Sequence, residues 1–143
     1  MTWDTGSLLS LALWLAGAGH FVTLGAGLQA PHRLGWVEDF AKLRPFNRKI
    51  FWTYYGFTGG TIVAFGCLTL ALHDEMLRGD RAALALAGFI AAFWTARITV
   101  DFFYFDHDDW PPGALLKIGH VLLTSLFIAM AGTYFGLVAF HVL

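Results

Sequence analysis

Charged side chains are scarce in this sequence, and cysteine is almost absent. Only 13% of its 143 residues are Asp, Glu, Lys or Arg, whereas soluble domains carry about 25%. The net charge of −1 argues against a nucleic-acid partner, which would require a basic face. The single cysteine, Cys67, excludes an intramolecular disulfide and any CxxC metal or redox motif. These shortages point away from a water-soluble domain and towards a protein that lies in lipid.

Apolar residues, which make up 57% of the chain, gather in four long runs. A membrane-spanning helix needs about 20 mostly apolar residues. The runs that reach this length cover residues 5–28, 51–72, 82–105 and 113–140. Lipid offers no partner to free backbone groups, so the runs should be helices, and short connections favour up-down-up-down order. The predicted fold is therefore all-α: an integral membrane four-helix bundle in one domain, residues 1–143.

A short amphipathic pattern lies in the first connection, within residues 34–43. Apolar side chains fall on one face at helical spacing, and charged side chains fall on the other. The apolar positions are Trp36, Val37, Phe40 and Leu43. The pattern predicts a short helix lying in the membrane interface, which ends before Pro45.

Basic residues concentrate in the same connection. Those of residues 29–50 are Arg33, Lys42, Arg44, Arg48 and Lys49. Lys and Arg mark cytoplasmic loops, so connections 29–50 and 106–112 should be cytoplasmic and both termini outside. Residues 1–7 contain no Lys or Arg, so we expect the first run to be a retained anchor rather than a cleaved signal peptide.

Ionisable residues lie deep inside the predicted spans, namely His20, Arg97, Asp101 and His120. Counted from the span ends, His20, Arg97 and His120 all lie about 10–12 Å below the cytoplasmic interface, and Asp101 lies about one turn closer. An ionisable group in lipid is costly and is by default a candidate functional site. We therefore expect these residues to meet in a polar cluster of the inner leaflet.

Aromatic residues accompany the cluster. Trp94 recurs with Arg97 and Asp101 on one stripe of the third span, and Tyr54 lies on a polar stripe of the second. We expect Trp94 and Tyr54 to line a binding site. A purely structural alternative remains open, because Arg97 and Asp101 at positions i and i+4 can neutralise each other and hold helices together.

Two ligands suit this cluster. A b-type haem would take His20 and His120 as axial ligands from two helices, with Arg97 pairing its propionates. A quinone or lipid headgroup would accept hydrogen bonds from His20 or His120 between aromatic walls. Either ligand predicts a redox-linked or electron-transfer role.

Two other hypotheses stay open. A non-haem metal site would use His20, His120 and Asp101, joined by Asp106 or His107. Alternatively, the chain is a non-catalytic accessory or structural subunit of a larger membrane complex, or a homo-oligomer. Its outward faces are rich in apolar side chains, which pack equally well against lipid or a partner.

The size and layout described above, four spans in a short chain with small loops, resemble those of small four-helix bacterial membrane proteins, among them the DoxX-like proteins. The resemblance implies a bacterial inner membrane, where the termini, which the basic residues place outside, would lie in the periplasm. It carries no residue roles to this chain.

Overall fold

The computed structural model describes residues 4–106, 108 and 112–143, and these residues contain helices and no strand. The elements are α1 (Thr5–Arg33), α2 (Trp36–Ala41), α3 (Pro45–Ala71), α4 (His73–Arg78), α5 (Arg81–Phe103) and α6 (Ala114–Val142). The four long helices are each long and apolar enough to cross a membrane. The predicted all-α four-helix membrane bundle is confirmed, and so is the short helix within 34–43, as α2.

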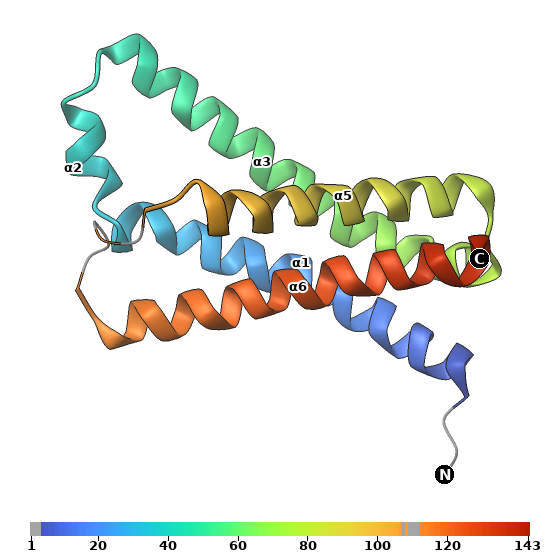
Figure 1. Cartoon of the computed structure of the whole chain (residues 1–143). Helices are drawn as coiled ribbons and strands as arrows, with labels where there is room; N and C mark the ends of the chain where they lie inside the picture. The colour runs from blue at the N-terminus through green and yellow to red at the C-terminus, as the bar shows by residue number, and fades with distance from the viewer. Residues whose placement is uncertain (1–3, 107, 109–111) are drawn as a thin grey trace.

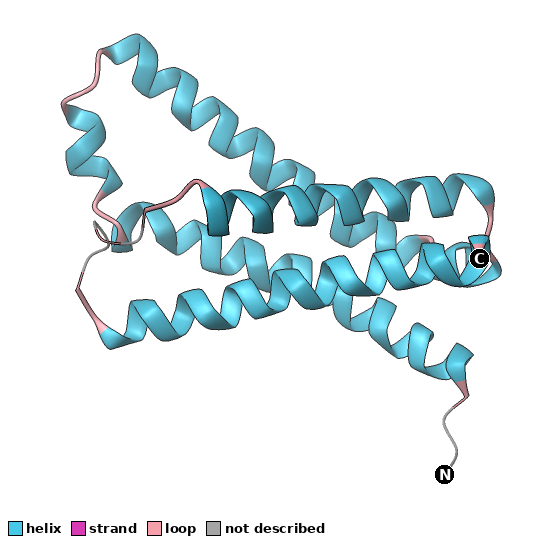
Figure 2. Ribbon diagram, in the orientation of Figure 1, coloured by secondary structure: helices cyan, strands magenta, loops and turns pink. Residues whose placement is uncertain are grey.

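The long helices alternate in direction, as predicted. Figure 1 shows the start of α1, α4 and the end of α6 at one end of the molecule, and α2, the end of α5 and the start of α6 at the other. We call these the termini end and the α2 end. Figure 2 shows that only short connections join the helices.

α1 and α3 extend further towards the α2 end than predicted, and each contains a proline in the added part. Pro45 is the first residue of α3 rather than only a stop signal before it, since its fixed φ and missing N–H suit the first helical turn. α1 continues past Leu28 to Arg33 with Pro31 inside it. Pro31 cannot donate to the carbonyl of Gly27, but the Tyr55 hydroxyl donates to that oxygen instead, at 2.7 Å.

The helices pack in two pairs, α1 with α3 and α5 with α6, and α1 also contacts α6. The largest fully buried apolar side chains are Leu13, Met76, Ile90, Trp94, Met130, Tyr134 and Leu137. Glycines bring α1 and α3 close together: a Cβ at Gly66 would lie 2.8 Å from the ring of Phe21. The core therefore lies in the middle of the bundle and towards the termini end.

The α2 end is open. α3 diverges from the other helices towards that end (Figure 1), and none of its residues before Phe65 is buried. Likewise α1 has no buried residue after Thr23, and α6 has none before Thr124. In α5, the only buried residue after Trp94 is Asp101. Asp101 is thus a buried polar group at the border between the packed and the open part of the bundle.

Candidate functional site

Asp101 is the centre of a polar network between α5 and α6. Its side chain is 3% exposed. One carboxylate oxygen accepts a hydrogen bond from Arg97 Nη1 at 3.4 Å, one turn earlier on α5. The other accepts from the Thr124 hydroxyl at 3.1 Å and lies 3.3 Å from His120 Nε2, both on α6. The structure therefore brings together Arg97, Asp101 and His120, which the sequence placed at similar depths.

Arg97 and His120 lie at the edge of this network. Their side chains remain 37% and 24% exposed, respectively. The Arg97 guanidinium carbon lies 5.5 Å from the ring centroids of both Phe105 and Phe127, a distance at which aromatic faces attract cations. The network thus presents a cation and an imidazole, next to aromatic rings, on the side where the bundle opens.

His20 belongs to a second polar group, deeper in the core. Its ring is fully buried. Nδ1 lies 2.8 Å from the Ala16 carbonyl oxygen, which accepts, so Nδ1 carries the proton. Nε2 then accepts a hydrogen bond from the Trp94 indole N–H at 3.1 Å. Both ring nitrogens of a neutral His20 have a hydrogen-bond partner within the protein. The burial of His20 therefore requires no bound ligand.

The two polar groups are linked through aromatic stacking. The Trp94 ring, which donates to His20, stacks on Phe127 with centroids 4.7 Å apart. Phe127 in turn carries Arg97 over its ring. Trp94 therefore connects the buried histidine to the Asp101 network, but no contact between His20 and His120 is part of that connection.

This geometry bears on the haem and metal hypotheses. A haem or a metal ion held by His20 would have to displace its hydrogen bond with Ala16 or with Trp94. Over residues 4–106, 108 and 112–143, no group of three or more His, Cys, Asp or Glu side chains is placed to hold a metal ion. His107, named above as a further metal ligand, lies outside the described residues. Both hypotheses therefore require His20 to give up one of its present hydrogen bonds.

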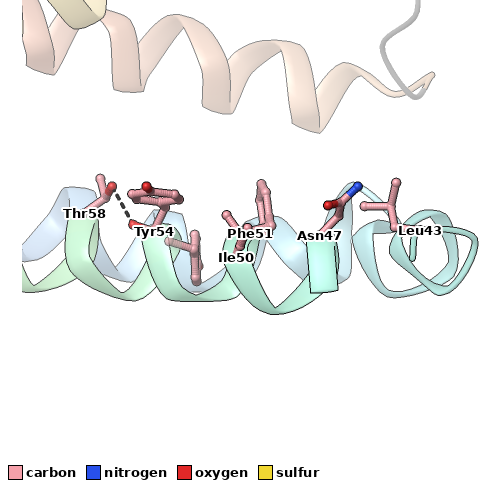
Figure 3. Close-up of a pocket in the computed structure, with 7 residues that line it drawn as sticks. Leu43, Asn47, Ile50, Phe51, Tyr54 and Thr58 are labelled. Carbon is pink, nitrogen blue, oxygen red and sulfur yellow. Dashed lines mark hydrogen bonds between the residues drawn. The ribbon is translucent and has the colours of Figure 1, made fainter. Parts of the chain in front are cut away.

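Tyr54 lies apart from both polar groups. Its side chain is 68% exposed on the diverging part of α3. It helps to line a groove of about 510 Å³ formed by Leu43, Asn47, Ile50, Phe51, Tyr54, Tyr55 and Thr58. Figure 3 shows the labelled side chains from Asn47 to Thr58 along α3 and Leu43 just before it, with Thr58 donating to the Tyr54 carbonyl.

A third polar group, at the termini end, was not predicted. His73 begins α4, where its Nε2 lies 3.2 Å from the Ser10 hydroxyl and its Nδ1 lies 2.9 Å from Asp74. Its ring also lies against Trp14, with centroids 4.6 Å apart. These contacts fasten α4 to the start of α1. The available signal was a histidine directly after an apolar run, but its partner Ser10 is 63 residues away.

Comparison with protein-family models, with curated proteins and with solved structures gives no match.

Proposed function

We propose that this small membrane protein binds an amphipathic ligand with a hydrogen-bond-accepting head at the Arg97–Asp101–His120 network, and that the ligand is a quinone. The observation that carries the proposal is the position of the network. A carboxylate that is 3% exposed holds Arg97 and His120 at the border of the open end, where both stay partly accessible.

A structural role alone would not need this arrangement. A pair that only neutralises charge is complete with Arg97 and Asp101, which already lie on one helix. Here α6 adds Thr124 and His120 to the same carboxylate. An arginine has five N–H donors, and among the described residues the Arg97 side chain makes one hydrogen bond. Donors therefore remain for a ligand inside the hydrocarbon layer, where water does not compete.

A quinone fits these groups better than a haem. Its carbonyl oxygens accept hydrogen bonds, which Arg97 supplies, and its ring suits the exposed aromatic side chain of Phe105 beside that arginine. Reduction of a quinone takes up protons, and an imidazole beside a carboxylate, as in His120 and Asp101, is a suitable donor. A haem would require His20 to give up a hydrogen bond that it already makes.

The test is binding of decylubiquinone to the purified protein in nanodiscs. The binding is measured by the quenching of tryptophan fluorescence. We expect Arg97→Gln to weaken binding at least tenfold, because the head group loses its charged donor. Arg81→Gln is the matched control, since Arg81 starts the same helix at the opposite end, and it should bind as the wild type does. Equal binding by all three proteins would refute the proposal.

An absorption spectrum separates the quinone from the haem hypothesis. We expect no Soret band in the air-oxidised or the dithionite-reduced protein. A Soret band that disappears in both His20→Ala and His120→Ala would replace the quinone proposal with a bis-histidine haem.

A further inference from the structure

The groove on α3 is the second candidate site, and it shares no residue with the Asp101 network. We propose that it holds one acyl chain of an anionic phospholipid, whose phosphate is bound by Arg44 and Arg48 at the α2 end. This proposal does not depend on a quinone at Arg97.

The length of the groove matches one leaflet. Its lining residues run from Leu43, just before α3, along the helix from Asn47 to Thr58 (Figure 3). The eleven helical steps from Asn47 to Thr58 span about 16 Å at 1.5 Å per residue. Half of the hydrocarbon core of a bilayer is about 15 Å thick. A chain lying in the groove therefore places its headgroup next to the start of α3.

The walls of the groove are apolar and aromatic. Ile50, Phe51 and Tyr55 line its middle, and Thr58 at its inner end donates its hydroxyl to the carbonyl of Tyr54. Thr58 therefore has no unpaired donor to offer a polar ligand. Such a surface suits a hydrocarbon chain, and on this proposal Tyr54 belongs to the lipid groove rather than to the quinone site.

Charge at the mouth of the groove selects the headgroup. Arg48 lies one turn before the groove residue Phe51 on α3. Arg44 is the N-cap residue of α3, three positions before the groove residue Asn47. Among the described residues neither arginine makes an ion pair, whereas Lys42 is paired with Asp39. Two unpaired cations above an apolar groove are complementary to a lipid that carries a phosphate and a net negative charge.

Lys49 provides a matched control. It lies one turn before Trp52 and Thr53, which do not line the groove. It has the same charge as the two arginines and a similar depth, and it makes no ion pair among the described residues. A diffuse attraction to an anionic membrane would use all three cations alike, but a site in the groove would use only Arg44 and Arg48.

The experiment measures which lipids stay bound when the full chain, equilibrated with equal amounts of phosphatidylglycerol and phosphatidylcholine in detergent, is analysed by native mass spectrometry. We expect the wild type to retain phosphatidylglycerol preferentially. Arg44→Gln and Arg48→Gln should each reduce that retention about fivefold, and Lys49→Gln by less than twofold. All three residues are exposed, so the variants should fold.

A second variant tests the tail. Ile50→Trp should fill the groove and reduce retention of phosphatidylglycerol while all basic residues remain. The proposal would be overturned if the wild type retained the two lipids equally, or if Lys49→Gln lost as much phosphatidylglycerol as the two arginine variants. Displacement of the lipid by millimolar inorganic phosphate would overturn it as well. A lipid-free dimer that Ile50→Trp dissociates would assign the groove to a second copy of the chain and would overturn it too.

Discussion

Single residues decide how this bundle tolerates polar groups in lipid, and Asp101 is the clearest case. Its carboxylate is buried, yet it has donors on two helices, Arg97 on its own and Thr124 and His120 on α6. A buried charge without partners would be very costly. The network therefore ties the open end of α5 to α6, whether or not a ligand is bound.

Removal of one partner should cost much more than removal of both. Asp101→Ala leaves Arg97 without a counter-charge, and we expect the free energy of unfolding to fall by about 3 kcal/mol. The double variant Arg97→Leu/Asp101→Ala should recover much of that loss. Unfolding in mixed micelles by SDS titration measures both. Additive losses would show that the two residues do not interact.

The same variants separate structure from function. If the double variant regains stability but no longer binds decylubiquinone, the network serves the ligand as well as the fold. Full binding by a stable double variant would reduce the pair to a structural role.

His20 should depend on one hydrogen bond from Trp94. Trp94→Phe keeps an aromatic ring against Phe127 but removes the indole N–H, so Nε2 of His20 becomes a buried acceptor without a donor. We expect a loss of about 1–3 kcal/mol, measured by thermal unfolding in detergent. Trp36→Phe is the control, because the indole of Trp36 makes no hydrogen bond among the described residues. An equal loss in both would show that ring volume, rather than the hydrogen bond, stabilises Trp94.

At the level of the helices, a proline in α1 is compensated by a tyrosine from α3. Pro31 leaves the carbonyl of Gly27 without its backbone donor, and the Tyr55 hydroxyl supplies one. In lipid every backbone group needs a partner. This hydrogen bond therefore joins α1 to the diverging part of α3.

Tyr55→Phe should consequently destabilise the α2 end. We expect a loss of about 1 kcal/mol and faster hydrogen exchange in residues 27–33. Tyr54→Phe is the adjacent control, since the hydroxyl of Tyr54 makes no hydrogen bond among the described residues. Pro31→Ala restores the backbone donor, so Tyr55→Phe should cost less in that background. An unchanged cost would show that the hydroxyl does not replace the missing N–H.

The helices themselves were predictable because apolar length is a strong signal, and the pairing of Arg97 with Asp101 followed from their spacing. The approach of His120 followed from a depth count. The hydrogen bond between Trp94 and His20 could not be predicted in this way, because depth in the membrane does not show how each helix is rotated about its axis. The missed α4 is only six residues long and lies outside any apolar run.

The molecule as a whole is a bundle with one packed end and one open end, and hydropathy alone could not distinguish them. Side chains that face lipid and side chains that face the core are both apolar, so the divergence of α3 leaves no mark on the apolar pattern. What the sequence did carry is the charge at the open end, in the basic residues of the segment 29–50. The opening and the basic cluster therefore coincide at the α2 end (Figure 1).

This charge predicts the orientation of the molecule in the membrane. The orientation in turn decides on which side of the membrane the two proposed binding sites lie. Five basic residues lie in residues 29–50 at the α2 end, whereas Arg78 and Arg81 are the basic residues near α4 at the other end. The excess should hold the α2 end in the cytoplasm. Both termini, which share the opposite end, should then face outside.

Reporter fusions at the C-terminus test this orientation. Alkaline phosphatase attached after Leu143 should be active, because it folds only outside the cytoplasm, and green fluorescent protein at the same position should be dark. Replacing Arg44, Arg48 and Lys49 together with Gln should weaken the bias and produce a mixed population. If the green fluorescent protein fusion of the unaltered chain is fluorescent, the C-terminus lies in the cytoplasm and the predicted orientation is wrong. The lipid groove and the Arg97 network would then open towards the outer leaflet, so their ligands would have to be sought there.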